Sequence, residues 1–277
     1  MTFVDHSRTV QYPGQAPAPR TLVTMVRYPA VGPLRDGDLA GAPPLRGGGP
    51  YPLVIFGHGF AVTPTIYAPL LRAWARAGYV VAAPIFPLGN ADAPGGPNES
   101  DLVNQPADMS FVITRMLAAS AAPAGPLSRM IDGRHIAVSG QSDGGDTALT
   151  AAYNSHFRDR RIGAAVILSG QEIPGVGGYD YPAPSPPLLA TQGLADTINL
   201  PATTYAFFDP ARPPKYLLTL PGAPHLPPYT YEQPQLSIVQ RVTIAFLDRY
   251  LKGHRGAVAR MISVADRPGI AALHTVP

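Results

Sequence analysis

The sequence predicts an α/β domain with a doubly wound, mostly parallel sheet, and two features lead to this prediction. Short apolar runs alternate with segments of helical spacing, which is the pattern of βαβ units. The runs are continuous and rich in β-branched residues, which is typical of strands covered on both faces. No repeat or long linker divides the 277 residues, so we expect a single domain over residues 1–277.

Seven apolar runs are the expected strands. They are Thr21–Tyr28, Leu53–Phe56, Tyr79–Ala83, His135–Ser139, Ala164–Ser169, Leu188–Gln192 and Lys215–Leu220. The first strands of the chain precede a Gly/Pro-rich loop at Val31–Pro50 and have no helix between them. We therefore expect them to form an antiparallel N-terminal edge of the sheet.

Four segments between the strands have helical spacing. They are Ile66–Gly78, Asp101–Ala119, Asp143–Tyr153 and Gln235–Leu251. The second follows the cap residue Ser100 and contains Pro106, where we expect an interruption. The Gly/Pro-rich stretch Gly170–Pro187 is too short for a helical lid, so we expect no large cap domain and an open cleft.

Composition excludes several classes of protein. Apolar residues make up 45% of the chain and charged residues 14%, which indicates a globular domain. The net charge of +3 comes from scattered arginines, as in Arg158-Asp159-Arg160, which favours a solvated surface and no nucleic-acid partner. The absence of cysteine excludes disulfides, thiolate zinc sites and a cysteine nucleophile.

Localisation is less constrained by the sequence. No apolar run reaches the roughly 20 residues of a membrane span. The first residues lack the pattern of a signal peptide, yet strand-like sequence follows Met1 almost directly. This favours a secreted protein whose leader has been removed over a cytoplasmic one, and the oligomeric state stays open.

The stretch Gly140-Gln141-Ser142-Asp143-Gly144 joins an expected strand to an expected helix. A Gly-x-Ser-x-Gly motif in this context is typical of a strained turn that exposes a nucleophilic serine. An ordinary strand-to-helix turn is the alternative interpretation. The carboxyl ends of other strands decide between the two, because ligands of open α/β sheets bind there.

Reactive residues follow three further strands. In Gly57-His58-Gly59-Phe60, the glycines allow a backbone N–H to face a developing oxyanion, and we expect the donors to be the N–H groups of Phe60 and Asp143. His58 precedes the serine in the chain and is expected to fix this loop. Asp196 and His225 follow the last two expected strands, and the alternative role of Asp196 is to cap the segment after Pro201.

Ser142, Asp196 and His225 therefore form the predicted catalytic triad, in the chain order Ser, Asp, His. With these motifs the chain resembles the α/β-hydrolase superfamily over nearly its whole length. It is most similar to the dienelactone-hydrolase-like, platelet-activating-factor-acetylhydrolase-like and cutinase-like serine esterases. Gln141 stands where that group often has histidine, and Asp143 where a methionine or other neutral residue is common.

The resemblance implies a serine hydrolase that cleaves carboxylic esters through an acyl-enzyme, with no metal and no organic cofactor. An open cleft favours hydrophobic or polymeric esters, as in a cutinase-like polyester hydrolase. Apolar side chains that follow the reactive strand ends are candidate substrate contacts, although each is also compatible with packing: Phe60, Ile66, Tyr67, Leu226 and Tyr229. The alternatives are a non-catalytic binding protein of the same fold and an acyltransferase or perhydrolase with the same triad.

Overall fold

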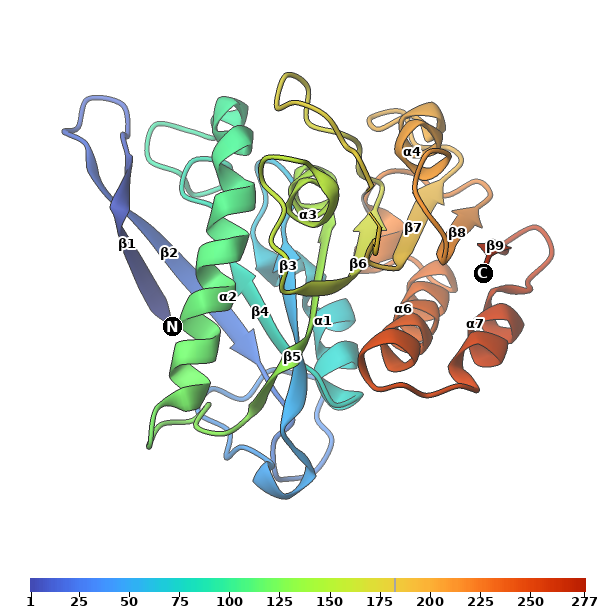
Figure 1. The fold of residues 1–277 in the computed structure, drawn as a ribbon, viewed down its shortest axis with the longest axis horizontal. Helices are drawn as coiled ribbons and strands as arrows, with labels where there is room; N and C mark the ends of the chain where they lie inside the picture. The colour runs from blue at the N-terminus through green and yellow to red at the C-terminus, as the bar shows by residue number, and fades with distance from the viewer. Residues whose placement is uncertain (182) are drawn as a thin grey trace.

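A nine-stranded sheet with helices on both faces forms the centre of the molecule (Figure 1). The computed structural model describes residues 1–181 and 183–277. In the order β1-β2-β4-β3-β5-β6-β7-β8-β9, the six strands from β4 to β8 are parallel, whereas β1, β2 and β9 pair antiparallel with their neighbours. The predicted fold class and the antiparallel N-terminal edge are thereby confirmed. The strand bounds are β1 (Thr2–Val10), β2 (Ala18–Arg27), β3 (Tyr51–Gly57), β4 (Val80–Pro84), β5 (Ile131–Gln141), β6 (Ile162–Leu168), β7 (Leu188–Gly193), β8 (Lys215–Leu220) and β9 (Ala272–Val276).

Alternation along the central strands supplies one core on each face of the sheet. Leu53 and Ile55 of β3 belong to the core shared with α2 and α3, whereas Val54 and Phe56 belong to the core shared with α1 and α6. The helices are α1 (Ala68–Arg76), α2 (Gln105–Ala121), α3 (Asp143–Tyr153), α4 (Pro201–Phe208), α5 (Pro227–Thr230), α6 (Gln235–Leu251) and α7 (Ala257–Ala265), with short 3-10 helices η1 (Arg46–Gly48), η2 (Pro64–Tyr67) and η3 (Glu99–Asn104).

The helical segment predicted over Asp101–Ala119 is divided into two helices beside Pro106, where an interruption was expected. Pro106 lies in the first turn of α2, and the residues before it form the separate helix η3. Proline is tolerated in this position because the first N–H groups of a helix have no partner within it. Pro106 therefore marks the start of the α-helix.

The described part of the connection between β6 and β7 forms no helical lid. The residues that the structure describes in this connection contain no helix, and one isolated bridge joins Asn154 to Tyr179. In the same described part of the chain, no helix combines the length and apolar character that crossing a membrane requires.

Candidate active site

The turn at Ser142 has a strained backbone conformation, and glycines on both sides of the serine leave room for it. Ser142 lies between β5 and α3 with φ 55° and ψ −127°, a sparsely populated region for a residue with a side chain. A Cβ atom on Gly140 would lie 2.0 Å from the carbonyl oxygen of Gly144, and one on Gly144 would lie 2.0 Å from that of Gly57. Glycine is required at both positions, which explains the motif.

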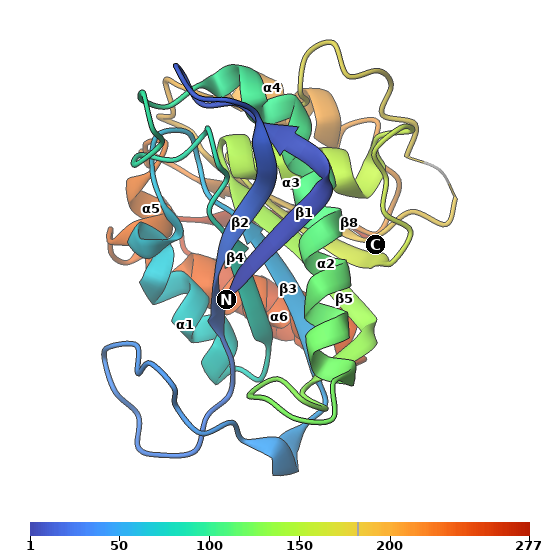
Figure 2. The same cartoon turned by 90° about the vertical axis from the view of Figure 1, so that its left-hand side faces the viewer.

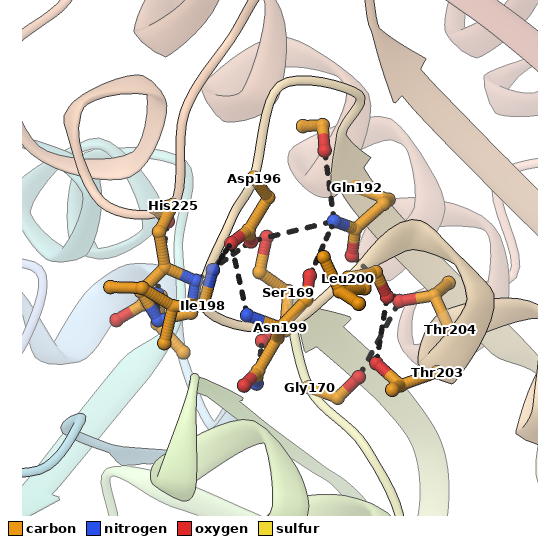
Figure 3. Close-up of polar contacts among 12 residues, drawn as sticks. Ser169, Gly170, Gln192, Asp196, Ile198, Asn199, Leu200, Thr203, Thr204 and His225 are labelled. Atoms are coloured by element: carbon orange, nitrogen blue, oxygen red, sulfur yellow. Dashed lines mark hydrogen bonds and ion pairs between the residues drawn. The ribbon is translucent and has the colours of Figure 1, made fainter.

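Asp196 and His225 form a hydrogen-bonded pair next to this turn (Figure 3). The Nδ1 atom of His225 lies 2.7 Å from Oδ2 of Asp196, while Oδ1 accepts from the N–H groups of Ile198 and Asn199. Burial raises the pKa of Asp196, but these donors outweigh it and leave the pKa below its ordinary value. An ionised Asp196 requires the proton on Nδ1, so Nε2 of His225 carries the lone pair.

A second layer of amide and hydroxyl groups holds Asp196 in place (Figure 3). Gln192 donates to the carbonyls of Gly193 and Asn199, at 2.9 and 3.0 Å, and its Nε2 lies 3.4 Å from Oδ2 of Asp196. The hydroxyl of Thr204 donates to Oε1 of Gln192 at 2.7 Å. This layer was not predicted from the sequence, although a glutamine at the end of a buried strand is a signal for it.

The side-chain amide of Gln141 faces the lone pair on Nε2 of His225. Its Nε2 lies 3.2 Å from Nε2 of His225 and donates to the carbonyl of His225 at 3.1 Å, while its Oε1 accepts from the hydroxyl of Tyr67 at 2.7 Å. That hydroxyl accepts from the N–H of Gly59, which fixes the orientation of the Gln141 amide. Among the described residues there is no hydrogen bond from Ser142 to His225. The amide of Gln141 is instead the group that contacts Nε2 of His225.

The two expected oxyanion donors flank the serine. The N–H of Asp143 is the first of α3 and has no partner within the helix. Phe60 follows Gly59, where an added Cβ would lie 3.3 Å from Cβ of Ser142. The carboxyl group of Asp143 is buried, its Oδ2 has no hydrogen-bond partner among the described residues, and burial together with Glu99 raises its pKa to about 6.

His58 fixes the loop after β3, as predicted. Its Nδ1 donates to the carbonyl of Gly59 at 2.8 Å, and its Nε2 accepts from the N–H of Phe86 at 3.0 Å. Only the neutral ring can donate at one nitrogen and accept at the other, and burial lowers its pKa to about 4. His58 is therefore unsuited to act as a base here, because both nitrogens are engaged.

Two of the expected substrate contacts belong to the core instead. Tyr67 and Tyr229 are fully buried: the ring of Tyr67 packs 4.9 Å from that of Phe56, and the hydroxyl of Tyr229 lies 2.8 Å from that of Ser169. Each hydroxyl finds a partner inside the protein, which allows the whole ring to be buried. Phe60 and Ile66 are exposed, at 36% and 37%, and Leu226 is partly buried.

Further exposed apolar side chains surround the strand ends and were not anticipated. They lie in η3 and α4, in the segment between β7 and α4, or directly after α5: Val103, Leu194, Ile198, Leu200, Tyr205 and Tyr231. Among the described residues, no three or more His, Cys, Asp or Glu side chains are grouped so that they could hold a metal ion.

Comparison with known proteins places the chain in a family. Residues 39–191 match the model of the family described as chlorophyllase. The chain belongs to the chlorophyllase family. The match includes the loop after β3 and the turn at Ser142, whereas Asp196 and His225 lie beyond it.

A solved structure extends the likeness over the whole fold. The ferulic acid esterase from Streptomyces cinnamoneus, solved at 2.4 Å resolution, is 22% identical to this chlorophyllase-family chain. The match has a TM-score of 0.68 and covers 97% of this chain and 92% of that one. The chain thus has the α/β-hydrolase fold. No curated protein matches it.

Proposed function

We propose that this member of the chlorophyllase family hydrolyses carboxylic esters with Ser142 as the nucleophile. The observation that carries the proposal is the 2.7 Å hydrogen bond between His225 and Asp196, beside a serine in a strained turn. Nucleophile, base and orienting carboxylate are the parts that acyl transfer requires.

In this mechanism Nε2 of His225 exchanges its contact with Gln141 for the hydroxyl of Ser142. Oγ of Ser142 forms a bond to the ester carbonyl carbon while its proton passes to Nε2. The negative charge on the carbonyl oxygen is stabilised by the N–H groups of Phe60 and Asp143. The tetrahedral intermediate then expels the alcohol, which takes the proton from His225. In the second half, His225 takes a proton from water as the water attacks the acyl carbon, and the acid leaves as Oγ of Ser142 regains its proton.

Hydrophobic or polymeric esters are the proposed substrate class. Several exposed apolar side chains lie on segments that follow the strands, and two of them, Phe60 in the loop after β3 and Ile66 in η2, are close in sequence to the proposed oxyanion donor. An exposed apolar patch of this kind favours binding of an apolar ligand. A polyester chain would need an uncovered site, and the described residues between β6 and β7 form no helical lid.

The first experiment measures hydrolysis of p-nitrophenyl esters from acetate to decanoate. We expect Ser142→Ala to lower kcat/KM by on the order of 10⁵-fold with the fold retained, and Asp196→Asn to lower it by about 10⁴-fold. Ser263→Ala, an exposed serine of α7, is the matched control and should be unchanged. Turnover that survives in Ser142→Ala would refute the proposal.

Two further assays separate the alternatives. Release of products from an amorphous aromatic polyester film, dependent on Ser142, would support the polymeric substrate. A protein that reacts once with an acyl probe and does not turn over would be a binding protein of this fold. Preferential transfer of the acyl group to an added alcohol or to peroxide over water would indicate an acyltransferase or a perhydrolase.

A further inference from the structure

A cavity of about 740 Å³ lies away from Ser142, and none of the candidate site residues lines it. It is lined by the end of β2, by α1 and by the segment 28–42 between β2 and β3. Arg27 of β2 pairs with Val81 near the start of β4, so this cavity is at the amino ends of the parallel strands, whereas the triad follows their carboxyl ends. Figures 1 and 2 both place this segment at the opposite end of the molecule from α4.

Hydrogen bonds fix the shape of the segment that follows β2. The N–H of Val31 donates to Pro43, and the N–H of Leu45 donates to Pro29, at 2.8 and 2.9 Å. The hydroxyl of Tyr28 donates to the carbonyl of Ala42 at 2.8 Å. These bonds join the two arms of the segment to each other and fix it as a closed loop that lines the cavity.

The charged side chains around the cavity are mostly cationic. Among the described residues, Asp38 is the only carboxylate that lines the cavity. Four arginines line it as well: Arg27, Arg35, Arg72 and Arg76. Burial raises the pKa of Asp38, but the bond from Arg27 and the charges of Arg72 and Arg76 lower it below its ordinary value. The single negative charge of Asp38 is thus shared among several positively charged guanidinium groups.

The pairing at Asp38 leaves positive charge without a partner. Arg27 donates two bonds to the carboxylate, at 3.0 and 2.7 Å, while Arg72 lies 3.8 Å from it. Arg76 donates to the carbonyl of Arg35, which does not neutralise its charge. Arg27 is only 8% exposed, and its Nη1 has no hydrogen-bond partner among the described residues. An anion would complete this arrangement.

Exposed apolar side chains line the same cavity. Leu34 is 85% exposed, and the other members of the group are between 42% and 56% exposed: Val23, Val31, Leu39 and Leu45. Single exposed apolar residues are ordinary, but a group around one cavity marks a surface that a ligand covers. The volume is within the roughly 300–1,000 Å³ of small-molecule sites.

We propose that this cavity is a binding site for an amphipathic anion, with a carboxylate paired to Arg72 and Arg76 and an alkyl chain held by Leu34, Leu39 and Val31. The volume of about 740 Å³ suits one small molecule, and the arginines favour a carboxylate head group, so the proposed ligand is a free fatty acid. An anionic lipid in a bilayer has the same head-and-chain chemistry, and the experiment separates the two. This site is independent of the ester hydrolysis proposed for Ser142.

The test is calorimetric titration with decanoate below its micelle concentration. We expect saturable binding, and about tenfold weaker binding of decyltrimethylammonium, which has the same chain and the opposite charge. Arg72→Gln/Arg76→Gln should weaken decanoate binding by about tenfold or more, because two charge-assisted bonds are lost. Arg255→Gln, an exposed arginine outside the cavity, is the control and should bind normally.

Each contrary outcome overturns the proposal. Equal binding of the cationic amphiphile would remove the role of charge. Unchanged binding by the double variant would place decanoate elsewhere, including at the apolar cleft near Ser142. Binding to phosphatidylglycerol vesicles without binding of free decanoate would indicate a membrane surface site. Circular dichroism establishes that the double variant is folded whether or not the protein hydrolyses esters.

Discussion

Gln141 links two parts of the candidate site that must act together. Its Nε2 contacts the lone pair of His225, and its Oε1 accepts from Tyr67, which in turn accepts from Gly59 beside the expected oxyanion donor. A donor to Nε2 stabilises the neutral imidazole and competes with Ser142 for the same lone pair. Gln141 is therefore a positioning residue for the proposed base.

Replacing Gln141 should alter the pH dependence of the proposed hydrolysis. In Gln141→Leu the neutral form of His225 loses a hydrogen bond worth about 0.5–1.5 kcal/mol, so protonation occurs more readily. We expect the acidic limb of the kcat/KM profile, which reports the free base, to move up by about half to one pH unit.

Tyr67→Phe is the matched control for this change. It removes the bond to Oε1 of Gln141 but retains the amide group that faces His225. Its acidic limb should stay near that of the wild type. A limb that does not move in Gln141→Leu, or that moves equally in both variants, would contradict the assigned role.

Among the secondary-structure elements, the N-terminal hairpin depends on a buried ion cluster. Arg20 of β2 is 2% exposed and donates two bonds each to Asp101 and Asp108, at 2.6–2.9 Å. Arg8 of β1 lies 2.8 Å from Asp108. The cluster connects β1 and β2 to η3 and α2, which lie beside the hairpin in Figure 2.

Removing the central cation should destabilise the fold. Arg20→Met leaves two carboxylates buried without their main partner, and we expect the free energy of unfolding to fall by about 3–5 kcal/mol in urea titrations. Arg134→Met breaks an ion pair of an arginine whose side chain is 85% exposed, so its loss should be about 1 kcal/mol or less. Equal losses in the two variants would contradict this account of the cluster.

Local sequence was sufficient for the elements that glycine and proline delimit. The predicted bounds of β8, α3 and α6 agree with the structure, and the other predicted strands and helices overlap their observed counterparts. The strand β9 and the helices α4, α5 and α7 were not predicted. The strand β9, Ala272–Val276, is short and half exposed, and it becomes a strand by pairing with β8.

The contacts within the candidate site were less predictable than its residues. Gly140, Ser142 and Gly144 are close in sequence, so the turn is a local pattern. The bond between Gln141 and His225 joins positions 84 residues apart, and no local spacing encodes it. Tyr67 and Tyr229 illustrate the same limit, since only the fold decides whether an aromatic ring faces a cleft or the core.

For the whole molecule, two buried groups make stability depend on pH in opposite directions. His58 has its pKa lowered to about 4 by burial, so its contribution is fully present above the unfolded value of 6.5 and is lost as pH falls toward 4. Asp143 has its pKa raised to about 6 by burial and Glu99, so it costs stability as pH rises from its unfolded value of 3.8 through 6. As pH falls from about 6.5 to about 4, the contribution of His58 to stability is lost, while the cost of ionising Asp143 is relieved.

Asp143→Asn should separate the two effects. Without the carboxyl group, the free energy of unfolding at pH 7 should rise by on the order of 3 kcal/mol, because no charge is buried beside Glu99. At pH 4.5 the carboxyl is mostly protonated in the folded state but mostly ionised in the unfolded state, so the gain should fall to about 1 kcal/mol. The variant should therefore lose stability more steeply on acidification. Urea titrations at pH 4.5 and 7 measure the difference, with Asp36→Asn on an exposed loop as the control. A gain of equal size at both pH values would mean that the ionisation of Asp143 is not its cause.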